Sequence, residues 1–207
     1  MSSITAYRKA LKEQILTTAM AAFAAHGIKA VKMDDIAHNL SISKRTLYEL
    51  YANKEVLLFE CLKCYKQRVE QIFQEKVSAC GNVISIILQF YILKAEESKK
   101  TNPLFYRDME KYPQIIRYLY QDKQKNHQRF ILFLERGMAD GYFRSDINCQ
   151  LVLQSFEALG EYTKKQSLYS QYSFDELFFN IYIVMLRGIS TPLGVEELDK
   201  NLRQLSV

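Results

Sequence analysis

Residues 33–57 form the stretch MDDIAHNLSISKRTLYELYANKEVL, on which the interpretation of the whole chain depends. Ile36, Ala37 and Leu40 have the spacing of one buried helix face. Residues 41–43 break that pattern, and a second short helix is predicted for residues 44–51. Two helices joined by so short a turn cross steeply, which leaves the second free to enter the major groove of DNA.

The turn between these helices needs a residue that tolerates a positive φ, and Ser41 occupies that position although glycine would adopt it more easily. Leu47, Leu50 and Tyr51 supply the buried side of the second helix. The opposite side carries hydrogen-bond donors suited to phosphates and base edges. These are Ser43, Lys44, Arg45, Thr46 and Tyr48.

A resemblance to a known family becomes specific at this point. LYELYANKEVLL (47–58) closely resembles the Leu-Tyr-x-x-Phe/Tyr-x-x-Lys-Glu-x-Leu signature of the tetracycline-repressor (TetR) family, and ILTTAMAAFAAHGIKAVKMDDIA (15–37) resembles the helix before it. The sequence departs from the family pattern at Ser41, where glycine is usual, and at Lys32, where threonine or serine is usual. The resemblance covers about residues 8–60 and implies a DNA-binding regulator.

The resemblance and the donor pattern together define the predicted DNA contacts. Lys54 follows Asn53, a predicted N-cap, so its ammonium would add to the positive end of the next helix. The Tyr48 hydroxyl is expected on a phosphate. The full set of predicted DNA-binding residues is Lys32, Met33, Ser43, Lys44, Arg45, Thr46, Tyr48, Tyr51 and Lys54.

Composition favours helices along the whole chain. Three Pro and seven Gly in 207 residues leave little room for β-turns. We predict an all-α protein of about nine helices, with a three-helix helix-turn-helix domain at 1–53 and a helical effector-binding and dimerisation domain at 54–207. The expected last helix covers about 174–190. The net charge of +5 is mild and does not by itself indicate nucleic acid.

Four irregularly spaced cysteines suggest reduced thiols and a cytoplasmic protein. The apolar runs are shorter than the ~20 residues that span a bilayer, so no membrane partner is expected. Cys61-x-x-Cys64 lies within a predicted helix and has no second pair to complete a zinc site. The sequence therefore predicts no catalytic residue, no metal site and no cofactor.

In the family that the chain resembles, the helical body commonly encloses an apolar effector site. Aromatic residues on the predicted body helices suit such a site, and an unknown small, largely apolar or aromatic effector is expected. The candidate ligand-binding residues are Tyr65, Phe90, Phe130, Phe133 and Phe156.

The last two long predicted helices carry more apolar surface than one core needs, which predicts a homodimer. Gly160 and Gly188 would allow close approach of the backbones across a two-fold axis. The candidate interface residues are Leu151, Val152, Leu159, Phe178, Phe179, Tyr182 and Met185.

The function predicted from these features is a sequence-specific DNA-binding transcriptional regulator, expected to act as a ligand-responsive repressor on a near-palindromic, double-stranded operator. Two alternatives remain open from the sequence. One is a helical-bundle enzyme or carrier that uses Cys61, Cys64 or a buried histidine. The other is a regulator of this fold that responds to a protein partner or to no effector.

Overall fold

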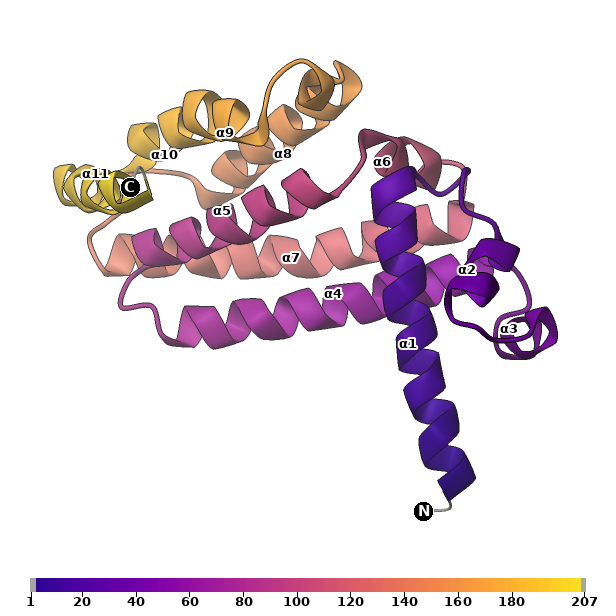
Figure 1. Cartoon of the computed structure of the whole chain (residues 1–207). Coiled ribbons are helices and arrows are strands. Elements are labelled where there is room, and N and C mark those ends of the chain that lie inside the picture. The colour runs from indigo at the N-terminus through magenta and orange to yellow at the C-terminus, as the bar shows by residue number, and fades with distance from the viewer. Residues whose placement is uncertain (1–2, 206–207) are drawn as a thin grey trace. The chain divides into compact units, whose positions relative to one another are not determined.

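A computed structural model describes residues 3–205 (Figure 1). The first eight helices are α1 (Ser3–His26), α2 (Met33–Asn39), α3 (Lys44–Leu50), α4 (Lys54–Ser78), α5 (Val83–Lys100), α6 (Pro103–Met109), α7 (Pro113–Ala139) and α8 (Cys149–Lys165). A short 3-10 turn at Leu168–Ser170 follows. Then α9 (Phe174–Leu177), a π-helical segment (Phe178–Tyr182) and α10 (Ile183–Ile189) run on continuously, and α11 (Pro192–Leu205) ends the described chain. These elements confirm the predicted all-α class.

The described residues form two compact units. Unit 1 contains the residues up to Ile72 together with Lys100–Leu119, and unit 2 contains Phe73–Lys99 and the residues from Tyr120 onward. Unit 1 extends beyond the predicted helix-turn-helix domain because the start of α4, α6 and the start of α7 share its hydrophobic core. That residues 1–53 form a separate domain remains a prediction.

The core of unit 1 is built from the apolar stripe of α1 and the inner faces of the helices that follow it. Burying such side chains is the main favourable contribution to folding, at about 25 cal/mol per Å² of apolar surface. The fully buried members include Ile15, Ala19, Phe23, Ile36, Leu47, Leu57 and Leu58. Figure 1 shows α2 and α3 as two short helices beside the much longer α1.

The turn between α2 and α3 confirms the backbone prediction for Ser41, whose φ is +52°. The Ile42 N–H donates to the Ala37 carbonyl at 3.0 Å, and the Ser41 N–H donates to the His38 carbonyl at 3.0 Å. This pair of bonds is the Schellman arrangement, in which the residue after the C-cap is left-handed. The next helix begins at once, because the Ser43 hydroxyl accepts the Thr46 N–H at 3.0 Å as an N-cap.

Replacing Ser41 with glycine is expected to stabilise the protein by about 0.5 kcal/mol. Glycine removes roughly 1 kcal/mol of left-handed strain, and the greater entropy of its unfolded chain offsets part of that gain. Urea denaturation of Ser41→Gly beside Ser41→Ala measures the effect, because alanine keeps the strained Cβ. If Ser41→Ala were clearly more stable than Ser41→Gly, the positive φ would carry no strain here, because only the unfolded-state entropy would then separate the two variants.

In unit 2, α5 supplies a large part of the buried core. Val83, Ile84, Ile87 and Tyr91 of that helix are all buried in the core of the unit. Further aromatic rings pack around Tyr91, whose hydroxyl donates to the Asp175 carboxylate at 2.9 Å. Burial of the phenol and, to a smaller extent, its hydrogen bond to Asp175 together raise the pKa of Tyr91 to about 12.

The final helix, α11, lies beyond the last helix expected from the sequence, which covers about 174–190. In the structure Pro192 is the first residue of α11, where its missing N–H has no effect on helix bonding. The Thr191 hydroxyl accepts the Gly194 N–H at 3.1 Å and caps the helix. A Cβ at Gly194 would lie 2.1 Å from the Tyr142 carbonyl oxygen, so only glycine fits this close approach. With α11 included, and α9 and α10 taken as one continuous helix, residues 3–205 contain ten helices, one more than predicted.

No helix within residues 3–205 has the combination of length and apolar composition that crossing a membrane requires.

Candidate nucleic-acid interface

The exposed side of α3 carries the predicted donors and is held rigidly from beneath. Leu47 is fully buried, whereas the side chains of Lys44 and Arg45 are 67% and 88% exposed. Tyr48 is exposed on the next turn. A short helix anchored on one face and rich in donors on the other is the geometry of a DNA-reading helix.

The two cations of this surface are paired with acids in the free protein. The Lys44 ammonium lies 2.5 Å from the Asp34 carboxylate of α2, and the Arg45 guanidinium lies 2.8 Å from Glu49. The hydrogen bond with Asp34 raises the pKa of Lys44, and the hydrogen bond with Glu49 raises that of Arg45. Exposed ion pairs of this kind contribute little to stability, so an incoming phosphate or base can replace either acid.

Ser43 and Thr46 have local bonding that limits what they can offer to DNA. The Ser43 hydroxyl caps α3, and the Ser43 and Thr46 hydroxyls lie 2.8 Å apart. Lys32 is exposed at the start of α2, where its backbone N–H donates to the Asp35 carboxylate at 2.9 Å. A lysine side chain cannot accept a hydrogen bond, so Lys32 cannot cap α2 as threonine or serine would. Asp35 instead satisfies the backbone N–H of Lys32 at this helix start.

Three of the predicted DNA contacts are revised by their surroundings. Met33 is 6% exposed and Tyr51 is 5% exposed, so both side chains belong to the core of unit 1. Burial also raises the pKa of Tyr51 to about 12. The Lys54 ammonium donates to the Ile28 carbonyl at 2.9 Å and to the Val31 carbonyl at 3.0 Å, so it fastens the loop before α2. Burial lowers the pKa of Lys54.

A second interaction that holds the loop before α2 was not predicted from the sequence. Asp108 of α6 is buried, and its carboxylate accepts the Lys29 N–H at 2.8 Å. That bond holds the pKa of Asp108 below its ordinary value. Asn102, just before α6, donates its N–H to the Ala24 carbonyl at 2.8 Å and so satisfies the end of α1.

Of Asp108 and Asn102, only Asn102 lies in a local sequence pattern that predicts its role. Asn102-Pro103 is typical of a helix start, and the Asn102 side chain indeed accepts the Leu104 N–H at 2.9 Å. The bond between Asp108 and Lys29 joins residues 79 positions apart, and nothing near either residue predicts the other.

The sequence match falls on this same part of unit 1. A family model described as "Bacterial regulatory proteins, tetR family" matches residues 15–61, which contain the helix-turn-helix geometry described above. Residues 15–61 carry the DNA-binding segment of the TetR family. The α1–α3 head is therefore a DNA-binding domain, and the protein is a transcriptional regulator.

Relatives of known name agree with this placement. The chain is 26% identical over 144 residues to the HTH-type transcriptional repressor KstR2 of Mycobacterium tuberculosis, covering 67% of this chain and 72% of that protein. KstR2 of Mycolicibacterium smegmatis is also 26% identical, over 148 residues, covering 68% and 71%.

Solved structures share the fold of this chain. A transcriptional regulator from Saccharomonospora viridis in complex with choline matches with a TM-score of 0.73 at 19% identity, covering 88% of this chain and 99% of that one. The ketosteroid transcriptional regulator KstR2 of M. tuberculosis matches with a TM-score of 0.55 at 20% identity, covering 87% and 95%.

The predicted effector residues of this regulator only partly come together. Within unit 2, the Phe130 ring lies 6.1 Å from that of Phe133 and 5.5 Å from that of Phe156. Phe90 is 49% exposed and packs edge-on against Phe73, so it does not join this cluster. Tyr65 is half-buried in unit 1.

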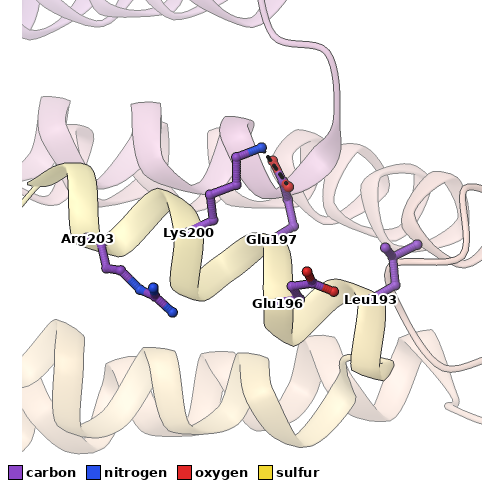
Figure 2. Close-up of a pocket in the computed structure, with 5 residues that line it drawn as sticks. All are labelled: Leu193, Glu196, Glu197, Lys200 and Arg203. Atoms are coloured by element: carbon purple, nitrogen blue, oxygen red, sulfur yellow. Dashed lines mark ion pairs between the residues drawn. The ribbon is translucent and has the colours of Figure 1, made fainter.

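An open hollow on α11 does not resemble the predicted effector site. Figure 2 shows the five residues that line its volume of about 410 Å³, and four of them are charged. Lys200 forms an ion pair with Glu197 at 3.6 Å along the helix. A hollow lined by Leu193 and charged side chains suits water and ions better than an apolar ligand.

The predicted dimer interface divides into exposed, half-buried and buried residues. Leu151 is 61% exposed and Phe179 is 36% exposed, whereas Val152, Leu159, Tyr182 and Met185 are half-buried. Phe178 is only 4% exposed because its ring packs against Tyr91 in the core, and we remove it from the interface. Val184 and Tyr162, which were not predicted, are 61% and 56% exposed.

The Cys61-x-x-Cys64 pair gives little support to the enzyme alternative. The Cys61 thiol is buried and donates to the Leu16 carbonyl at 3.5 Å. Burial raises the pKa of Cys61 to about 12, so the thiol stays protonated at neutral pH and is a poor nucleophile or metal ligand. In residues 3–205, no group of three His, Cys, Asp or Glu side chains could hold a metal ion.

Proposed function

We propose that the protein is a homodimeric repressor that binds a near-palindromic operator, one half-site per α3, and releases it when a small molecule binds to unit 2. The observation that carries the proposal is the exposed donor surface of α3 on its buried Leu47 anchor. Relatives of this chain are named transcriptional repressors, which supports repression rather than activation. We assign no catalytic step to the chain.

The contacts of α3 divide into two kinds. Lys44 and Arg45 lie in its first turn, which is the part of such a helix that meets base edges. Each exchanges its acid partner, Asp34 or Glu49, for a base acceptor when DNA arrives. Tyr48, one turn further along, binds a phosphate and positions the helix without reading sequence.

This division is tested with Lys44→Ala, Arg45→Ala and Tyr48→Phe. We expect the first two to lose about 1–3 kcal/mol on the cognate site and to change base preference, because they remove base contacts. Tyr48→Phe is expected to weaken binding to all sequences alike. Binding to a library of single-base operator variants measures both effects, with Lys63→Ala on α4 as a control. Unchanged base preference in both α3 alanine variants would contradict the proposal.

The dimer is proposed to form through the exposed apolar residues of α8 and α10. Leu151, Tyr162 and Val184 expose large apolar side chains that a single chain leaves uncovered. A Cβ added at Gly160 or Gly188 would meet no atom within 4 Å, so both glycines leave room for a second backbone. Identical surfaces related by a two-fold axis would bury these residues together.

Release by an effector is proposed from the aromatic cluster of unit 2. Phe130, Phe133 and Phe156 are only partly buried, and their rings are suited to an apolar or aromatic ligand. The ligand would have to bind better to the conformation that fits the operator poorly, because only differential affinity shifts the equilibrium. The choline complex of one structural neighbour and the ketosteroid name of another support a small molecule while indicating different classes.

The effector site can be tested by enlarging a side chain in the cluster. Leu132 on α7 is 58% exposed, so a larger side chain there cannot fill a space inside unit 2. Phe133→Trp is the better variant because Phe133 contacts both Phe130 and Phe143. We expect loss of the ligand response with operator affinity retained. A fall of about 1–3 kcal/mol in stability would instead identify solid core.

A further inference from the structure

The first turns of α1 extend beyond the core of unit 1. Leu11 is the first buried residue of that helix, and Ala6 to Ala10 are all exposed, with Tyr7 at 69%. Figure 1 shows the N-terminal part of α1 continuing past α2 and α3. Packing against the core therefore does not stabilise this projecting segment, and helical turns without tertiary contacts are only marginally stable in water.

The projecting segment is strongly basic. Arg8, Lys9 and Lys12 lie within five residues, and the first acidic residue of the chain is Glu13. All three basic side chains are exposed. None of them forms an ion pair with a described residue, unlike Lys44 and Arg45 on α3. Three uncompensated positive charges on one short segment fit an anionic surface.

The direction of these side chains follows from helix geometry. Residues three, four and seven positions apart share a helix face. Arg8 is therefore on the same face as Leu11 and Ile15, which are buried against the rest of unit 1. Lys12 lies one turn after Arg8 on the same side. Where α1 leaves the core, the face that carried apolar residues now carries positive charges.

The other end of α1 is occupied by α6. The Ala24 carbonyl accepts the Asn102 N–H there, and the Asn102 side chain donates to the Ala25 carbonyl at 3.4 Å. The basic segment is thus at the end of α1 opposite to this attachment. It lies in the same head as α2 and α3, beyond the part of α1 against which α2 packs (Figure 1).

We propose that residues 6–12 of α1 form a second DNA-contact surface, in which Arg8, Lys9 and Lys12 bind backbone phosphates flanking the bases contacted by α3. The inference rests on the proposed operator binding and adds a site to it. The occupant is duplex DNA, because the segment belongs to the same DNA-binding head as α2 and α3 and DNA carries one negative charge per about 1.7 Å of its axis. Contacts of this kind add affinity and salt dependence but no sequence preference.

The test replaces Arg8, Lys9 and Lys12 with alanine and measures operator affinity across a salt series. Each phosphate contact contributes about 0.9 to the slope of log K against log salt. Three contacts per head therefore make the wild type lose about 40-fold more affinity per head than the variant between about 50 and 200 mM salt. The base preference of the variant is expected to be unchanged.

Two control variants separate charge placement from net charge and from folding. Lys99→Ala, Lys200→Ala and Arg203→Ala combined remove three exposed charges from α5 and α11 and should leave the salt slope unchanged (Lys200 and Arg203 are drawn in Figure 2). Arg8→Lys, Lys9→Arg and Lys12→Arg combined keep the charges and should retain the wild-type slope. Trimming the duplex flanks should weaken the wild type and leave the α1 alanine variant unaffected.

The outcomes separate this inference from the proposed function. Absence of any specific DNA site for the wild type would overturn the proposed function. Specific wild-type binding with the same salt slope in the α1 alanine variant would overturn only the inference. The inference would also be overturned, in favour of a membrane surface, if the α1 alanine variant lost binding to anionic phosphatidylglycerol vesicles that the wild type binds, while its operator binding stayed unchanged.

Discussion

Replacing both Leu151 and Val184 with glutamate is expected to convert the regulator into monomers and to reduce operator affinity by about 100–10,000-fold. Both side chains are 61% exposed in the single chain, so neither replacement disturbs the core. In the dimer, however, the new carboxylates would face each other across the two-fold axis without partners. The operator then loses the gain in affinity that comes from binding two linked heads.

The measurement combines light scattering for the oligomeric state with operator binding at fixed salt. Leu132→Glu is the matched control, because Leu132 on α7 is 58% exposed and lies outside the proposed interface. A Leu151/Val184 variant that stayed dimeric would move the interface elsewhere on the chain. A monomeric variant that kept full operator affinity would refute the need for a dimer.

Replacing Asp108 with alanine is expected to destabilise unit 1 by about 1–3 kcal/mol and to weaken operator binding. Asp108 is 4% exposed, and without its carboxylate the Lys29 N–H loses the acceptor it has at 2.8 Å. A hydrogen bond to a charged group contributes about that much to stability. The loop that Asp108 fastens leads into α2, so the loss affects the position of the DNA-reading helices. Urea denaturation and operator binding measure the two effects, with exposed Asp140→Ala as the control.

The charge of Asp108 also predicts a pH dependence. The Lys29 N–H bond lowers the pKa of Asp108 in the folded protein, so the charged form stabilises folding above the ordinary carboxyl pKa. This contribution is lost as the pH falls through the lowered pKa. We expect the difference in unfolding free energy between wild type and Asp108→Asn to be constant from about pH 7 to 5 and to shrink below about pH 4. A difference unchanged at acid pH would exclude a role for the charge.

Much of the fold could be predicted because its signals are local. Asn53 caps α4 as predicted, with its side-chain oxygen accepting the Val56 N–H at 2.9 Å. Gly27 has a φ of +81° after α1, and Ser41 has the positive φ that its turn requires. Each of these features depends on residues within one or two helical turns, which neighbouring sequence specifies directly.

The candidate sites were less predictable because they depend on what packs around each residue. Phe90 and Phe178 have the same aromatic character in the sequence, yet one is half-exposed and the other is 4% exposed. Lys54 follows a helix cap, as a phosphate-binding lysine would, but its ammonium is committed to two carbonyls of a loop more than twenty residues away.

The sequence by itself determined most of the helices, the left-handed turn between α2 and α3 and the exposed donors of α3, because apolar spacing and cap residues act over a few positions. The tertiary structure alone decided that Met33 is a core residue and that Asp108 holds the loop before α2. Burial and long-range bonds arise when distant helices pack together. No local pattern encodes them, since the same residue type can satisfy either environment.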